Sequence, residues 1–102
     1  MTSLTAQDLL AARVRLPQHV VHRSFVAETV VLNLRTGQYH GLNPTAGRML
    51  DALADAPAAG AVVAELAQEY GVEEATVETD LLCLCHGLLE RGLIEVVDDG
   101  GR

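Results

Sequence analysis

The side chains of this chain that could bind a metal or act as nucleophiles are chiefly its four histidines and two cysteines. His19 and His22 are three residues apart, but they lie in a strand-like stretch, where residues three apart face opposite sides. Cys83 and Cys85 point roughly 200° apart on a helix, so they can neither form a disulfide nor easily share one metal ion. Cys85 and His86 are adjacent and diverge as well. These spacings predict no metal site and no disulfide.

The familiar catalytic arrangements are also missing. All seven positive charges are Arg, so no lysine is present for Schiff-base chemistry or for a phosphate-binding loop. Two serines and these histidines form no set of nucleophile, base and orienting group. We therefore expect a protein that is not an enzyme and that needs no cofactor. We expect both cysteines to be buried as small apolar residues in a reduced cytosol.

The composition is that of one folded domain with neither nucleic acid nor a membrane as partner. The 102 residues are 49% hydrophobic and 21% charged, which is ordinary for a folded protein. No apolar run approaches the ~20 residues of a membrane helix, and Met1-Thr2-Ser3-Leu4 lacks the basic start of a secretory signal. Residues 1–48 carry five Arg against two acids, whereas residues 49–102 carry two Arg against twelve acids. An acidic half of this kind repels a phosphate backbone. We expect a cytoplasmic protein.

The elements that must position any site begin with three antiparallel strands in a meander. The first runs from Val14 to Phe25, and Pro17 makes it a bent or edge strand. The second runs from Val26 to Leu34, and its two faces carry Val30, Leu32 and Leu34 on one side and Val31 and Asn33 on the other. Arg35-Thr36-Gly37 turns the chain, with Gly37 supplying a positive φ. Gln38 to Leu42 returns as the third strand.

Three helices follow. Asn43 is placed to cap the first helix and Pro44 suits its first turn, so this helix covers residues 44–54. The second covers residues 61–70 and stops at Gly71. The third covers residues 73–91, and its apolar side chains form two stripes roughly 100° apart, wider than a single core contact needs. We expect the surplus width to face another element or a ligand.

The fold class that these elements predict is α+β, a three-stranded antiparallel β meander followed by three helices. A short extended segment at residues 93–97 completes a winged helix-turn-helix. We divide the chain into an N-terminal arm (1–13), the main domain (14–97) and a flexible tail (98–102). The pattern at residues 1–12 leaves open a short helix or a loose arm.

Two segments of the chain resemble the PqqD-like family, whose members are also called RiPP recognition elements. One is the strand–turn–strand that leads to Leu42-Asn43-Pro44-Thr45-Ala46, where the family has Leu-Asn-x-x-Ala. The other runs from Asp80 to Ile94, where the family has Asp-Val-x-x-Phe-Leu-x-x-Leu-x-x-x-Gly-Leu. Here Leu81, Leu84 and Cys85 replace Val, Phe and Leu. The resemblance covers residues 14–97, and the hairpin at residues 34–39 is most similar to the stand-alone versions from lasso-peptide pathways.

The resemblance implies a domain that binds the leader peptide of a ribosomally made natural-product precursor. The leader would add as a strand to the third strand and lie in the cleft against the third helix, and the domain would deliver it to a leader peptidase and a cyclase. The peptide-binding residues implied are Gln38, Tyr39, His40, Gly41, Leu42, Val77, Asp80, Leu81 and Leu84. Several of these have an ordinary structural reading too, since the three leucines suit a core position and Asp80 suits a solvated helix surface.

Two other functions compete with this interpretation. The last fifty residues have the order of a winged-helix DNA-binding regulator, but the helix at 73–91 carries five acids against Arg91 alone. The second competitor is an adaptor that pairs with itself through the same open strand edge, which the sequence does not exclude.

Overall fold

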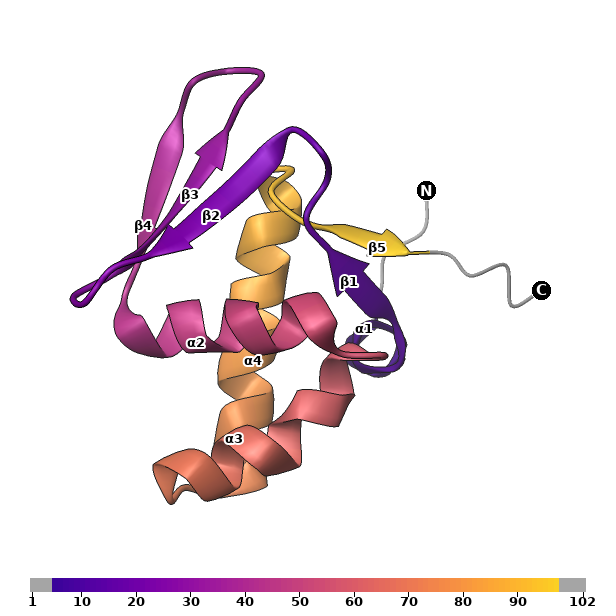
Figure 1. Cartoon of the computed structure of the whole chain (residues 1–102). Coiled ribbons are helices and arrows are strands. Elements are labelled where there is room, and N and C mark those ends of the chain that lie inside the picture. The colour runs from indigo at the N-terminus through magenta and orange to yellow at the C-terminus, as the bar shows by residue number, and fades with distance from the viewer. Residues whose placement is uncertain (1–4, 98–102) are drawn as a thin grey trace.

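The computed structural model describes residues 5–97, so the predicted tail at 98–102 and the first four residues of the predicted arm lie outside the described part. These residues form ten elements in order: α1 (Ala6–Ala11), β1 (Arg13–Arg15), β2 (Val20–Ser24), β3 (Thr29–Asn33), β4 (Tyr39–Leu42), α2 (Pro44–Asp55), the 3-10 turn η1 (Ala59–Val62), α3 (Val63–Tyr70), α4 (Glu74–Glu90) and β5 (Glu95–Val97). Figure 1 shows their arrangement, with α4 passing behind α2.

Strands β2, β3 and β4 form the predicted antiparallel meander, in that order across the sheet. The β3–β4 turn closes through Asn33, whose Oδ1 accepts the backbone N–H of Arg35 at 2.9 Å and whose C=O accepts that of Gly37 at 2.8 Å. Gly37 has φ of +75°, as the turn prediction required. The β2–β3 connection takes up residues 25–28, so β3 begins three residues later than predicted.

The stretch predicted as one bent strand from Val14 to Phe25 is two strands in two different sheets. β1 pairs antiparallel with β5, and only β2 joins the meander. The chain turns between them, where the N–H of Val20 donates to the C=O of Pro17 at 2.9 Å. Pro17 has no N–H to give to a ladder, so a continuous strand is broken here and the two halves pair separately. The predicted wing is therefore half of a two-stranded ribbon that β1 completes.

The helices follow the local signals closely. Asn43 caps α2 by accepting the N–H of Ala46 at 2.8 Å, and Pro44 occupies the first turn. The second predicted helix is a 3-10 turn leading into α3, which ends at Gly71 with φ of +67°. α4 starts and ends within one residue of the prediction.

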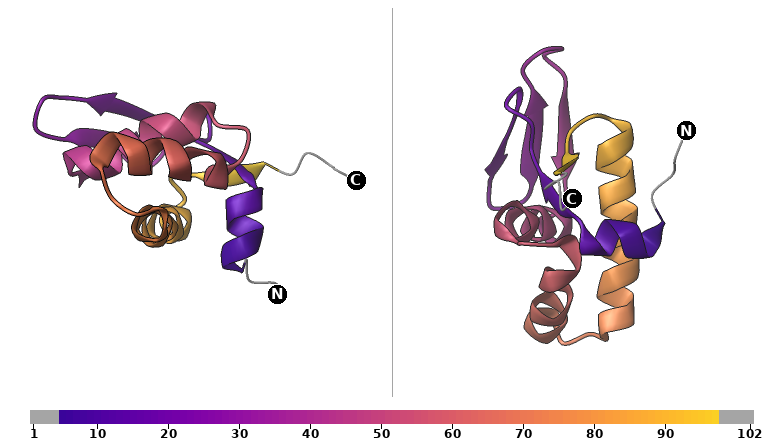
Figure 2. Two further views of the ribbon diagram at one scale, coloured as in Figure 1. Left: turned by 90° about the horizontal axis from the view of Figure 1, so that it is seen from below. Right: turned by 90° about the vertical axis from the view of Figure 1, so that its right-hand side faces the viewer.

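One core joins all the layers, and α1 belongs to it. Leu9 of α1 is fully buried, so the first residues described form the short helix and not the loose arm. α1 contacts α4 and crosses it in the right-hand view of Figure 2, which accounts for part of the surplus apolar width of α4. The same view shows the sheet standing to one side of α4, so one sheet face is turned toward the helices.

A close approach of α2 to β3 sets the position of α2 beneath the sheet. Gly47 is buried, and a Cβ built on it would overlap the side chain of Thr29, with the Thr29 Cβ only 2.7 Å away. At its other side α2 is joined to α3 by Arg48, which contacts both carboxylate oxygens of Glu69 at 2.9 and 3.0 Å. The hydrogen bond to Glu69 raises the pKa of Arg48. The small size of Gly47 therefore allows the start of α2 to come this close to β3.

Candidate functional site

The candidate site is centred on β4, one of the two outer strands of the meander; the other is β2. Antiparallel pairs alternate between residues that exchange backbone hydrogen bonds and residues that do not. In this register the bonded pairs are Asn33–Gln38, where N–H to C=O is 2.9 Å, and then Val31–His40 and Thr29–Leu42. The N–H and C=O groups of Tyr39 and Gly41 therefore point away from β3, toward the free edge. They are the backbone groups that an added strand would bond.

The side chains of β4 divide between the two faces of the sheet. Tyr39 and Gly41 lie on the outer face, in register with Leu32 and Val30. Tyr39 is 71% exposed. His40 and Leu42 lie on the inner face and are half-buried, in register with Val31 and Thr29. Gln38 precedes the strand and is exposed. All five residues predicted on this strand are thus at or beside the edge, although only two have their backbone free to bond.

A hollow of about 310 Å³ begins where β4 ends. We call it the inner hollow, and its walls are Asn43, Thr45, Ala46 and Met49 from the start of α2 and Asp80 and Leu84 from α4. It brings two of the predicted helix residues, Asp80 and Leu84, together with the start of α2, which directly follows β4. Sequence reasoning did not place the cap residue Asn43 or the three α2 residues in the site, although Asn43 and Pro44 marked the helix start from which the others follow.

Two of the peptide-binding residues that the resemblance implies on α4, Val77 and Leu81, are buried. Their side chains are only 3% and 0% exposed, and both belong to the core. Leu84, one turn beyond Leu81, is half-buried and reaches the hollow. The apolar arc of α4 is wide enough both to pack in the core and to line the hollow. The helical period of the sequence alone does not show which apolar residues take which role.

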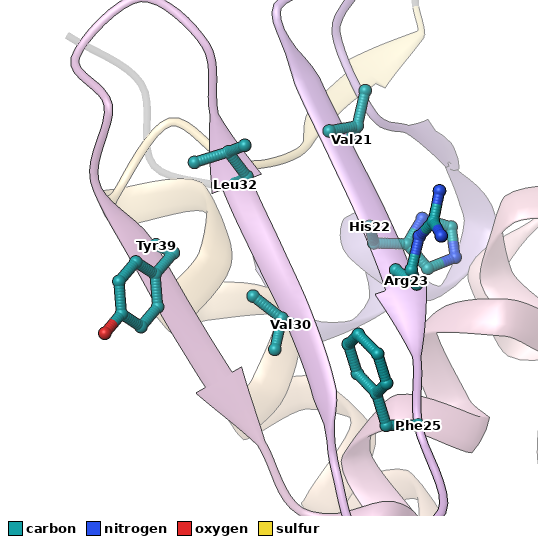
Figure 3. Close-up of a pocket in the computed structure, with 7 residues that line it drawn as sticks. All are labelled: Val21, His22, Arg23, Phe25, Val30, Leu32 and Tyr39. Carbon is teal, nitrogen blue, oxygen red and sulfur yellow. The ribbon is translucent and has the colours of Figure 1, made fainter.

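A second hollow, of about 480 Å³, lies on the outer face of the sheet. We call it the outer hollow; Figure 3 shows its lining of Val21, His22, Arg23, Phe25, Val30, Leu32 and Tyr39. Phe25 is 58% exposed and Val21 45%, so this is a largely uncovered apolar surface of the kind found at interaction sites. Sequence reasoning had placed Val30 and Leu32 on one face without assigning that face to solvent.

The histidines and cysteines do not gather into a reactive centre. Among residues 5–97 no group of three His, Cys, Asp or Glu side chains could hold a metal ion. His22 Nε2 instead lies 3.0 Å from Asp51 Oδ1. Cys85 is buried as expected, and burial raises its pKa to about 11. The expectation for Cys83 is wrong, because this side chain faces solvent on α4.

The negative charge on α4 argues against the DNA-binding alternative. The free edge of β4 is compatible with the self-pairing alternative. Glu74, Glu78, Asp80 and Glu90 are all exposed on the helix that would have to enter a groove lined by phosphates. In the described part of the chain, no helix combines the length and apolar character that crossing a membrane requires.

The chain matches the family model described as coenzyme PQQ synthesis protein D (PqqD) over residues 28–94. A comparison with curated protein sequences found no match.

Two solved structures share the fold. One is TbiB1 in complex with the TbiA(beta) leader peptide. The match has 30% sequence identity and a TM-score of 0.73, and it spans 83% of this chain and 99% of the chain in that structure. The other is lasso peptide synthetase B1 complexed with the leader peptide. The match has 31% sequence identity and a TM-score of 0.74, and it spans 82% of this chain and 99% of the chain in that structure.

Proposed function

This chain belongs to the PqqD family, and from that membership we propose that it binds the leader peptide of a ribosomally synthesised precursor in lasso-peptide biosynthesis. The domain has no chemistry of its own and acts in the cytoplasm. It holds the leader while a leader peptidase and a cyclase act on the precursor. The observation that carries the proposal is the free edge of β4, where two residues present unpaired backbone groups beside an open hollow.

In this proposal the leader adds as a fourth strand to β4. The backbone groups of Tyr39 and Gly41 bond the leader, which supplies affinity that depends little on sequence. Leader side chains that face inward pass His40 and Leu42 and reach the inner hollow, where Leu84 offers an apolar surface and Asp80 a carboxylate. We propose that Gln38 contacts the leader beside the strand, and that Val77 and Leu81 are buried residues that support the α4 side of the inner hollow.

Fluorescence polarisation tests the proposal directly. The probes are fluorescein-labelled leaders of the short precursors encoded beside this chain, with the TbiA(beta) leader as a second probe and a random DNA duplex as control. We expect one leader to bind with micromolar or tighter affinity and the duplex not to bind. Absence of leader binding, together with DNA binding that weakens as salt rises, would overturn the proposal in favour of a regulator.

Leu84→Glu should abolish leader binding, because it places a second carboxylate beside Asp80 and removes apolar surface from the inner hollow. The matched control is Cys83→Glu, which adds the same charge to the same helix at an exposed position. Far-UV circular dichroism must show that both variants are folded. If a folded Leu84→Glu variant binds the leader as tightly as the control does, the inner hollow is not part of the site.

A further inference from the structure

Glu28 places a carboxylate over the free edge of β4. Its Oε1 lies 3.0 Å from the point that a Cβ on Gly41 would occupy. The carboxylate can lie this close because Gly41 has no side chain. A Cβ at this position would meet Glu28 Oε1 at 3.0 Å, a tight contact that the flexible Glu28 side chain would relieve by shifting slightly.

The register explains how a residue of the β2–β3 connection reaches this edge. Glu28 immediately precedes β3 and, two residues before Val30, falls on the same outer face. Val30 is opposite Gly41, so Glu28 and Gly41 are diagonal neighbours across the β3–β4 pair. Gly41 is also one of the two residues whose backbone faces the free edge. The carboxylate therefore lies where the outer face of the sheet meets the edge.

Among residues 5–97, no basic side chain forms an ion pair with the carboxylate of Glu28. The ion pairs there join Arg15 to Glu95, His22 to Asp51, and Arg48 to Glu65 and Glu69. Arg23 shares the outer face but forms none of these pairs. Glu28 is exposed, so it keeps its hydration and remains available to a charge that arrives from solution.

A strand that adds to β4 brings one side chain directly opposite Gly41. In an antiparallel addition this residue and Gly41 exchange backbone hydrogen bonds, and its side chain lies on the outer face, about 5 Å from the position that a Cβ of Gly41 would occupy. Since Gly41 contributes no side chain, the cross-strand neighbour of the incoming residue is the Glu28 carboxylate. Opposite charges at such positions stabilise the pairing, and like charges oppose it.

We propose that Glu28 selects leaders that carry a basic side chain, Arg or Lys, at the outward position opposite Gly41. The inference rests on the proposed function, because it requires the leader to add at β4. The Glu28 carboxylate would then select leader sequences on the outer face of the sheet, independently of the apolar contacts in the inner hollow.

The test is a scan of the tightest-binding leader, in which each residue in turn is replaced by Arg or by Gln. For the wild-type protein we expect Arg to bind about two- to fivefold tighter than Gln at one position, the range of an exposed ion pair. The preference should shrink as salt is raised. In Glu28→Gln it should disappear, and in Glu28→Arg a Glu at that position should be preferred to Gln.

Two further variants separate this role from a general effect. Gly41→Ala keeps the backbone N–H, and its Cβ meets Glu28 Oε1 at 3.0 Å, a tight contact that a small shift of the carboxylate relieves, so it should weaken the Arg preference without removing it. Asp55→Asn removes an equally exposed carboxylate at the far end of α2 and should leave the preference intact. If wild type and Glu28→Gln bind the leader but give the same Arg-to-Gln ratio at every position, the role of Glu28 is wrong and leader binding stands. If no leader binds the wild type, both proposals fail.

Discussion

The backbone N–H of Gly41 can be removed without breaking the sheet, because it points away from β3. We expect Gly41→Pro to weaken leader binding about two- to tenfold through the lost hydrogen bond alone, and more where the ring obstructs the incoming strand. Gly41→Ala adds a Cβ but keeps the N–H, so the difference in fluorescence-polarisation Kd between the two variants measures the combined cost of the lost N–H and the added ring. A folded Gly41→Pro variant with wild-type affinity would show that the leader does not add at β4.

Cys85 makes stability depend on pH at the alkaline end. Burial raises the pKa of this thiol to about 11 from its ordinary value of 9.0, so between those values the unfolded chain loses a proton that the folded chain retains. Stability from this group is complete below pH 9 and is lost as pH rises toward 11.

Urea unfolding at several pH values between 8 and 11 measures this loss. We expect Cys85→Ala to be less stable than wild type at pH 8, because it leaves a small cavity, but to lose less stability as pH rises. Cys83→Ala should keep the wild-type slope. If the free energy of unfolding falls equally with pH in wild type and in Cys85→Ala, the alkaline loss of stability does not come from Cys85.

The packing of α2 on β3 depends on one missing methyl group. Gly47→Ala improves helix propensity, yet its Cβ overlaps Thr29, a buried side chain that also hydrogen bonds to Ser24 at 3.0 Å. We expect a loss of about 1–3 kcal/mol in the free energy of unfolding, the usual cost of overpacking. The effect should extend to leader binding, because α2 forms one wall of the inner hollow.

Gly87→Ala is the matched control for this substitution. Gly87 is also helical, but the nearest atom to its added Cβ is Arg91 Nη1 at 3.9 Å, an ordinary contact. Here the better helix propensity of Ala should stabilise the protein by about 0.4–1 kcal/mol. Equal urea midpoints for the two variants would mean that α2 can move away from β3 at no cost.

Binding at one edge should stabilise the entire domain, since β4 leads directly into α2 and α2 contacts α4. A leader at a hundredfold excess over its Kd adds about 2.7 kcal/mol to the free energy of unfolding. For a domain of this size the thermal midpoint should rise by roughly 10–20 °C. Differential scanning fluorimetry with the cognate leader and with a scrambled leader of the same composition measures the shift. Equal shifts for both peptides would contradict sequence-specific capture.

Self-pairing through β4 would use the same backbone groups, so the two functions compete. Light scattering over a concentration series distinguishes them. A protein that dimerises through this edge should become monomeric when the leader is added, because one strand cannot occupy the edge while another copy does.

The sequence by itself determined the features that depend on residues a few positions apart. The turn at Gly37, the cap at Asn43 with Pro44 after it, the end of α3 at Gly71 and the alternation of β3 are all set by local backbone preferences and hydrogen bonds. The order of the meander and the helices followed from these signals together with the family resemblance.

Only the tertiary structure decided which surfaces remain uncovered. The pairing of β1 with β5 joins residues at opposite ends of the chain, so no local pattern around Pro17 could assign β1 to a separate ribbon. The period of α4 gave the direction of a wide apolar arc, but its neighbours decided that Val77 and Leu81 are core and that Leu84 reaches the inner hollow. The position of Glu28 over Gly41 likewise depends on strand register. Burial and long-range pairing depend on how elements pack, and local periodicity carries no information about that.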